Sequence, residues 1–128
     1  MVQSAAQALN QKIAIINAST DLELDKAFAT FQNDAIGAFI VVADPFFVNR
    51  RDQIISLSNQ QRIPGMYFLR EFAESGGLAS YGVSLADAYR EAGAYAGKII
   101  GGTKPNDLPV IQPTKFDLVI NVKAAKMA

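Results

Sequence analysis

The sequence predicts a single α/β domain, in which a parallel β-sheet of the Rossmann or flavodoxin kind carries helices on both faces. Two observations support this fold class. Short β-branched or aromatic runs alternate with amphipathic helical segments along the chain, which is typical of repeated β-α-β units. The 128 residues are 50% hydrophobic, enough for one buried core. We therefore expect one domain over residues 1–128.

The strands are expected where short apolar runs are bounded by turn residues. The segment from Ala38 to Ala43 is apolar throughout, which predicts a central strand buried on both faces. The run that begins at Ile13 is rich in β-branched residues, which favour strands. The expected strands are residues 13–17, 37–43, 66–69, 78–81 and 116–121.

The helices are marked by their caps. Thr20 and Glu23 form a capping box, Asp44 precedes a proline at the first helical position, and Ser84 precedes the longest apolar stripe. Glycines at 101 and 102 end that last helix. The expected helices are residues 2–10, 20–33, 44–60, 71–75 and 84–100, with another beginning at residue 123.

The composition excludes several kinds of function. The chain has no histidine and no cysteine, so it cannot form a Ser-His-Asp or Cys-His catalytic site or a thiolate or imidazole zinc site. Its 12 basic and 12 acidic residues cancel, which argues against a nucleic-acid-binding surface. The segment Gly93 to Lys98 lacks the spacing of a phosphate loop. We expect no metal, no cofactor and no catalytic residue.

The termini give two further expectations. The longest apolar stretch is far shorter than the roughly 20 residues that a membrane-spanning helix needs, so we expect no membrane insertion. The first residues lack the basic and apolar regions of a signal peptide. The chain as given is therefore expected to stay in the cytoplasm.

Candidate ligand contacts follow the expected strands, because ligands of open parallel sheets bind beyond the carboxyl ends of the strands. Asp44 is either a helix cap alone or a cap that also contacts ligand. Phe46 could offer an aromatic wall, and Arg70 could bind a carboxylate or form an ion pair on the rim. Tyr81 could stack on a ligand or be a half-buried hinge residue.

Two other interpretations involve the same edge of the sheet. Asn17 and Ser19 follow the first expected strand and are further candidate contacts. Asp44 and Glu71 could form the paired carboxylates of a small hydrolase, but nothing in the sequence fixes their separation.

Several short motifs together resemble those of the solute-binding proteins of ABC importers, in the branch with tryptophan- or tyrosine-type importer binders. The resemblance runs from Gln7 to Met127. The motifs that carry it are residues 44–47, 70–72, 77–82, 104–109 and 112–116.

The resemblance implies a type I periplasmic binding protein, in which two Rossmann-like lobes close on a solute and deliver it to a permease. It covers only the second lobe and the final crossovers. It therefore implies that the helix at 84–101 would pack on an absent first lobe, and that the family acts in the periplasm or cell envelope. The solute could be an amino acid or another small polar or aromatic molecule. With an amino acid, Asp44 would lie near the ammonium and Arg70 near the carboxylate.

A lobe without its partner would expose a strand edge and an apolar helix face. We therefore expect a homo-oligomer, formed by exchange of the C-terminal helix and strand, or a separate first-lobe partner. The alternative functions are a stand-alone flavodoxin-like interaction or regulatory module and a non-functional gene remnant.

Overall fold

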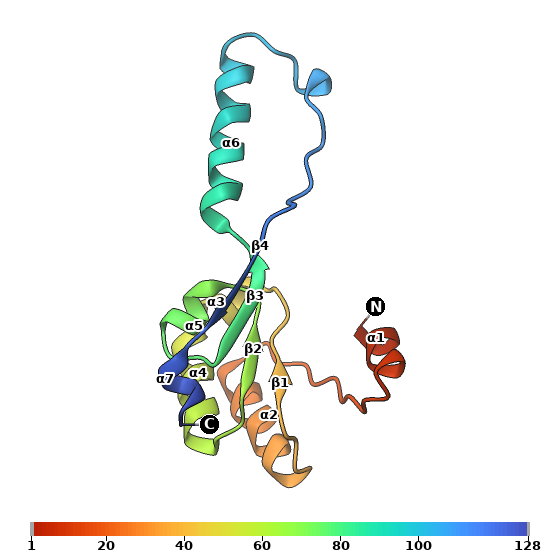
Figure 1. The fold of residues 1–128 in the computed structure, drawn as a ribbon, viewed down its shortest axis with the longest axis vertical. Helices are drawn as coiled ribbons and strands as arrows, with labels where there is room; N and C mark the ends of the chain where they lie inside the picture. The colour runs from red at the N-terminus through yellow and green to blue at the C-terminus, as the bar shows by residue number, and fades with distance from the viewer. Residues whose placement is uncertain (1, 128) are drawn as a thin grey trace.

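A computed structural model of the chain describes residues 2–127. Its centre is a four-stranded sheet in the order β1-β2-β3-β4 (Figure 1). The first three strands are parallel and the last is antiparallel. The predicted α/β class with a largely parallel sheet is confirmed. The strands are β1 (Phe39–Ile40), β2 (Gly65–Tyr67), β3 (Ala79–Val83) and β4 (Phe116–Ile120).

The helices alternate with the strands up to β3, and one long helix then separates β3 from β4. They are α1 (Val2–Ala8), α2 (Asp21–Asn33), α3 (Pro45–Asn49), α4 (Arg51–Gln61), α5 (Arg70–Glu74), α6 (Leu85–Ile100) and α7 (Val122–Ala125), with a short 3₁₀ turn, η1 (Pro105–Asp107), after α6.

The buried core lies between one face of the sheet and the helices α2, α4 and α5. Phe72 of α5 is fully buried and stacks on Tyr67 of β2, with 4.8 Å between ring centroids. Phe28 of α2 meets the ring of Phe39 edge-on at 5.3 Å. Ile54 and Ile55 of α4 belong to the same cluster, together with Leu24, Val41 and Leu69. Burial of these side chains, at about 1.5–3 kcal/mol each, holds the three helices on this face.

The opposite face of the sheet carries apolar side chains that remain accessible. The register pairs Ile40 with Met66 and Tyr81 with Leu118, and directly paired residues point to the same side of a sheet. The rings of Tyr81 and Phe116 stack at 5.7 Å on this side. We call this surface the uncovered face; its members are Ile40, Met66, Tyr81, Phe116, Leu118 and Ile120, each at least 37% exposed.

Two strand predictions were wrong. Residues 13–17 form no strand, because their backbone finds no ladder partner. Residues 37–43 were expected to form a central strand, but only Phe39–Ile40 are strand, at the edge of the sheet. The apolar run of this segment is therefore explained in part by the uncovered face, to which Ile40 belongs, while Val42 beyond the strand is also exposed.

The helix expected at 44–60 is two helices. Arg50 ends α3 and begins α4 with φ −110° and ψ 16°, outside the helical region. Its amide still donates to the carbonyls of Phe46 and Phe47, so the chain turns without losing those bonds. The helix expected at 71–75 begins one residue earlier, at Arg70.

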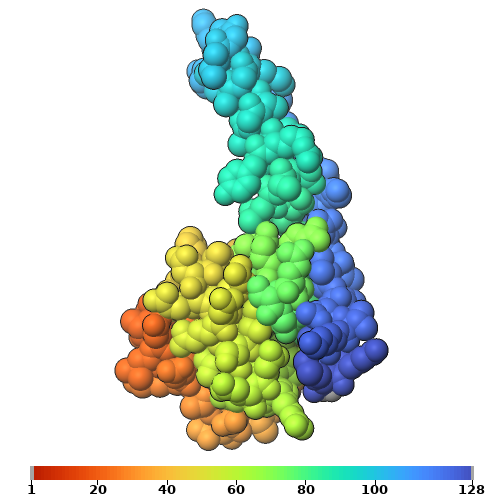
Figure 2. Space-filling view, turned by 90° about the vertical axis from the view of Figure 1, so that its left-hand side faces the viewer, coloured from red at the N-terminus to blue at the C-terminus, as the bar shows by residue number. Residues whose placement is uncertain are grey.

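Helix α6 projects away from the rest of the molecule (Figures 1 and 2). None of its residues is buried. The chain returns beside it, and the hydroxyl of Tyr95 donates to the carbonyl of Pro109. At the base, the carboxylate of Asp87 lies 3.5 Å from the ammonium of Lys115. The helix and the returning segment thus form an arm whose two parts contact each other and which packs against the core at its base, through Leu85.

Candidate functional site

Three helices begin directly after the carboxyl ends of β1, β2 and β3. Their N-caps are Asp44 for α3, Leu69 for α5 and Ser84 for α6. Free backbone N–H groups and the positive end of the helix dipole both lie at such N-termini. This edge of the sheet therefore favours an anionic or acceptor group, and we take it as the candidate site.

Asp44 caps α3. Its Oδ1 accepts a hydrogen bond of 2.8 Å from the amide of Phe46, which confirms the capping role. The side chain is exposed, and among the described residues only this oxygen has a hydrogen-bond partner. A contact between the second oxygen and a ligand stays a prediction.

Phe46 is half-buried at the first turn of α3. Its ring meets that of Phe47 edge-on at 5.5 Å, and the guanidinium of Arg50 lies 5.8 Å from its centroid. Neighbours thus hold the ring on two sides. A held ring with one accessible part can serve as a wall for an aromatic or apolar ligand group.

Arg70 forms an ion pair, which was the alternative to ligand binding. Its partner is Glu74 and not the neighbouring Glu71. Its Nε donates to Oε1 of Glu74 at 2.9 Å, and this bond raises the pKa of the guanidinium further. The pair is exposed on both sides, so it contributes little to stability. Arginine has five N–H donors, and only Nε is engaged among the described residues, so a carboxylate could still bind.

The hydrolase interpretation gains no support from the geometry. Asp44 is used as a helix cap, and Oε2 of Glu71 is buried without a hydrogen-bond partner among the described residues. A carboxylate oxygen turned inward is not available to act together with Asp44 on a bound substrate.

Tyr81 does not lie at the end of its strand, as the sequence suggested. It is in the middle of β3, 57% exposed on the uncovered face. The stack with Phe116 fixes its ring there. The structure therefore places Tyr81 on the uncovered face of the sheet and not among the helix N-termini.

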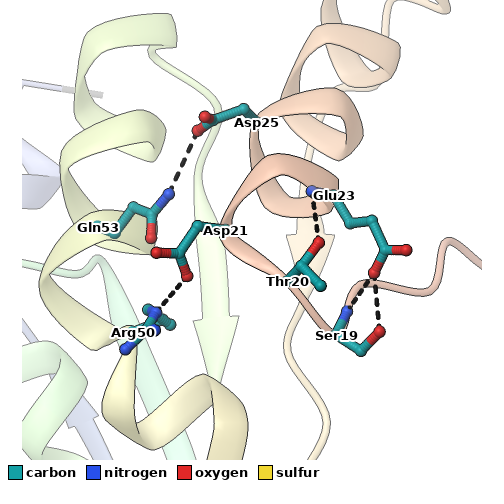
Figure 3. Close-up of polar contacts among 7 residues, drawn as sticks. All are labelled: Ser19, Thr20, Asp21, Glu23, Asp25, Arg50 and Gln53. Carbon is teal, nitrogen blue, oxygen red and sulfur yellow. Dashed lines mark hydrogen bonds and ion pairs between the residues drawn. The ribbon is translucent and has the colours of Figure 1, made fainter.

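Ser19 and Asn17 lie in the extended segment before α2. Ser19 donates from its amide and its hydroxyl to Oε2 of Glu23, at 2.7 and 2.8 Å (Figure 3). These bonds lower the pKa of Glu23, the amide bond most. Thr20 accepts from the amide of Glu23 at 3.2 Å, as the capping box predicts. Ser19 is thus engaged in capping α2, while Asn17 is exposed.

A polar cluster that the sequence did not predict joins α2 to α3 and α4. Arg50 pairs with Asp21, and Gln53 donates to Asp25 at 3.3 Å (Figure 3). Arg50 was interpreted as part of a solvated helix face, because nothing in the sequence shows that the helix breaks there. The cluster holds the start of α2 beside the α3–α4 junction, and so beside Phe46.

The ends of β2 and β3 approach each other unusually closely at Gly82. A Cβ built on Gly82 would lie 1.9 Å from the carbonyl oxygen of Phe68, which no side chain tolerates. This contact fixes the backbone before Arg70 against the end of β3. The structure thus places Asp44, Phe46 and Arg70 along one edge of the sheet.

A cavity of about 490 Å³ lies away from this edge. It adjoins Pro64 and Leu78, which come just before β2 and β3, and so lies at the amino ends of the strands. None of the predicted contacts lines it. Its walls are Ser58, Asn59, Arg62, Ile63, Pro64, Leu78, Ala124 and Met127.

Residues 2–127 contain no cluster of three or more acidic side chains that could hold a metal ion. No helix in the same range is long and apolar enough to cross a membrane.

The chain is similar to known binding proteins. A family model described as ABC transporter substrate binding protein matches residues 1–128. A conserved domain protein from Vibrio cholerae has a similar structure, with a TM-score of 0.86 at 22% identity over 98% of this chain. An ABC domain from Streptococcus pneumoniae in complex with L-Trp has a TM-score of 0.83 at 22% identity over 96%.

A third similar structure is the ligand-free, open form of a substrate-binding protein with adhesive properties from Clostridium difficile, with a TM-score of 0.67 at 20% identity over 98% of this chain. In all three cases the match covers 42% of the other protein. The chain therefore spans less than half the length of these proteins. No curated protein matches it.

Proposed function

Because this chain belongs to the family of ABC transporter substrate-binding proteins, we propose that it supplies one half of a binding site from which a small solute reaches an ABC importer in the cell envelope. Binding is non-covalent, at the edge where α3, α5 and α6 begin. The observation that carries the proposal is the placement of Asp44, Phe46 and Arg70 after adjacent strands, together with the family match.

The solute class follows from the chemistry of this edge. Arg70 and the helix N-termini suit a carboxylate, Asp44 suits an ammonium group, and Phe46 suits an aromatic or apolar side chain. These three features together describe an amino acid. The complex of the Streptococcus pneumoniae neighbour with L-Trp supports an aromatic one.

One lobe covers a solute from one side only. Enclosed sites bury most of their ligand, so the proposed site requires a second surface over the edge. Since the chain spans 42% of its structural neighbours, a second lobe and a permease are the partners that we propose. Binding to this chain alone is expected to be weak.

Thermal unfolding with a panel of free amino acids tests the proposal. A ligand that binds only the folded state raises the melting temperature once its concentration exceeds its dissociation constant. We expect a rise with aromatic amino acids, L-Trp among them, and a smaller one in the variants Phe46→Ala and Arg70→Gln. The control is Arg62→Gln, an exposed arginine beside the cavity at the other end of the sheet.

Two results would count against the proposal. The panel could give no change in the melting temperature at millimolar concentrations, or the change could be as large in the Phe46 and Arg70 variants as in the original chain. A smaller rise confined to the Arg62→Gln control would show that the site is the cavity and not the edge.

A further inference from the structure

Asp117 lies near the start of β4, where that strand meets the end of β3. The burial of β4 alternates, with Phe116 and Leu118 exposed and Asp117 between them half-buried. Successive side chains of a strand point to opposite faces of the sheet, so Asp117 points to the face that the helices cover. Its carboxylate forms no ion pair with any described residue.

The backbone that leads to Arg70 lies beside Asp117. In the register of the sheet, Asp117 is directly opposite Gly82 of β3, and the Cβ positions of such a pair are about 5 Å apart. The carbonyl oxygen of Phe68 takes the place that a side chain of Gly82 would need, 1.9 Å from its Cβ position. Asp117 is therefore next to the short turn that joins β2 to Arg70.

The packing of α5 on β4 agrees with this placement. Asn121, at the end of β4, donates to the carbonyl of Ala73 at 2.8 Å, so the last turn of α5 lies at the end of that strand and Arg70 lies towards its start. The hydrogen bond and the charge of Glu74 raise the pKa of the Arg70 guanidinium most, and the charge of Asp117 raises it further. The guanidinium is thus flanked by two carboxylates, of which only Glu74 is in contact with it.

Arg70 and Asp117 are therefore neighbouring groups of opposite charge that do not form an ion pair. The bond to Glu74 uses Nε of Arg70, and the two terminal nitrogens have the geometry to bind a carboxylate. The oxygens of Asp117 accept hydrogen bonds, as an ammonium group requires. In an α-amino acid the ammonium and the carboxylate are attached to one carbon atom, so the side chains that bind them must be near neighbours.

Asp44 is the other acidic side chain that follows a strand at this edge, and it is less suited to the ammonium group. Its Oδ1 already accepts the 2.8 Å bond from the amide of Phe46, and its side chain is exposed. Asp117 is half-buried, and water and salt screen a partly buried charge less than an exposed one. The burial of the two residues thus favours Asp117.

We propose that Asp117 binds the ammonium group of the solute and so gives the site its preference for α-amino acids over other carboxylates. The inference rests on the proposed solute site at this edge of the sheet. The solute carboxylate lies on the terminal nitrogens of Arg70, and its aromatic group lies towards Phe46. The role of Asp44 is then to cap α3.

NMR titration with three matched indoles tests the role of Asp117. L-Trp carries both charged groups, indole-3-propionate lacks the ammonium group and tryptamine lacks the carboxylate. We expect L-Trp to bind the original chain more tightly than the other two. Asp117→Asn should raise the dissociation constant of L-Trp by at least about tenfold, since it removes a charged hydrogen-bond acceptor, and should not weaken the binding of indole-3-propionate. Asp117→Ser, which also removes the charge, should behave in the same way.

The matched control is Asp44→Asn, which keeps a capping oxygen for α3 and should leave both dissociation constants unchanged. Spectra without ligand show whether each variant is folded. Unchanged L-Trp binding in the folded Asp117 variants overturns the inference, and so does an equal loss of L-Trp and indole-3-propionate. A selective loss of L-Trp in Asp44→Asn also overturns it, because Asp44 would then bind the ammonium. In these three cases the solute site itself stands, whereas no binding of any of the three molecules to the original chain would contradict both proposals.

Discussion

At the residue scale, the close approach at Gly82 has the most direct consequence. An added methyl group would meet the Phe68 carbonyl oxygen at 1.9 Å, and that oxygen belongs to backbone, which cannot rotate away. The ends of β2 and β3 would have to separate. Since Arg70 follows Phe68 by two residues, the candidate site would be disturbed with them.

We therefore predict that Gly82→Ala lowers the free energy of unfolding by about 3 kcal/mol, as overpacking of a fixed contact does. The matched control is Gly93→Ala in the middle of α6, where an added Cβ meets nothing within 4 Å. It should raise stability by about 0.5–1 kcal/mol, because alanine favours the helix. Urea unfolding of both variants measures the difference; a Gly82 variant as stable as the original chain contradicts the packing described.

Tyr67 is the second informative residue. It is 1% exposed, and its hydroxyl has no hydrogen-bond partner of ordinary geometry among the described residues. The hydroxyl of Ser58 donates its own proton to the carbonyl of Ile63 at 2.7 Å. Its position beside the Tyr67 phenol lowers the pKa of that phenol by less than burial raises it. Burial raises the pKa of the Tyr67 phenol above its usual 10.0.

The raised pKa predicts a loss of stability in alkali. The folded state holds the phenol proton more tightly than the unfolded state, so stability is constant below pH about 10 and falls as pH rises towards the folded pKa. In Tyr67→Phe this fall should shrink, and stability at neutral pH should be unchanged or higher by about 1 kcal/mol. Urea midpoints of both proteins at neutral and alkaline pH check this. An equally steep fall in both would show that another group is responsible.

At the element scale, local signals predicted where helices begin. Contacts between residues far apart in the sequence determine which segments form strands and where a helix breaks. The caps at Thr20, Asp44 and Ser84 depend on hydrogen bonds to the next turn, so the sequence alone could predict them. The strand expected at 13–17 needed a neighbour that the sequence cannot show. The helix breaks at Arg50, whose side chain contacts Asp21, 29 residues away.

The residues of the candidate site also divide into those that the local sequence predicts and those whose position depends on long-range pairing. Asp44, Phe46 and Arg70 could be predicted because each follows a strand end, and the topology brings strand ends together. Tyr81 was misplaced, because β3 continues two residues beyond it, to Val83, through its pairing with β4, which lies far away in the sequence. The partner of Arg70 was also missed: Glu71 is adjacent in sequence, but helix geometry places the residue four positions on, Glu74, beside Arg70.

Asn121 joins two elements at the C-terminal end. Its Oδ1 accepts from the amide of Ala124 at 3.0 Å and caps α7, while its Nδ2 donates to the carbonyl of Ala73 at 2.8 Å at the end of α5. We predict that Asn121→Ala costs about 2 kcal/mol of stability, through both bonds. Asn121→Ser keeps a capping oxygen but has no amide donor, so it should cost about half as much. Equal losses in chemical unfolding would show that the bond to Ala73 alone matters.

At the scale of the whole molecule, two large surfaces lack a partner within the described residues: the uncovered face and the arm built on α6. The core holds α2, α4 and α5 on one side of the sheet, and the edge with Asp44 and Arg70 lies open. A protein in this state is suited to acting with a second body, whether another lobe above the edge or another copy across the face.

Hydrogen–deuterium exchange, with and without a saturating aromatic amino acid, tests the central claim of a solute site at the carboxyl ends of the strands. We predict slower exchange in the first turns of α3 and α5, around Phe46 and Arg70, and no change around Ser58 and Arg62. Slower exchange confined to the segment around Ser58 and Arg62, or no change anywhere in the chain, would contradict the account.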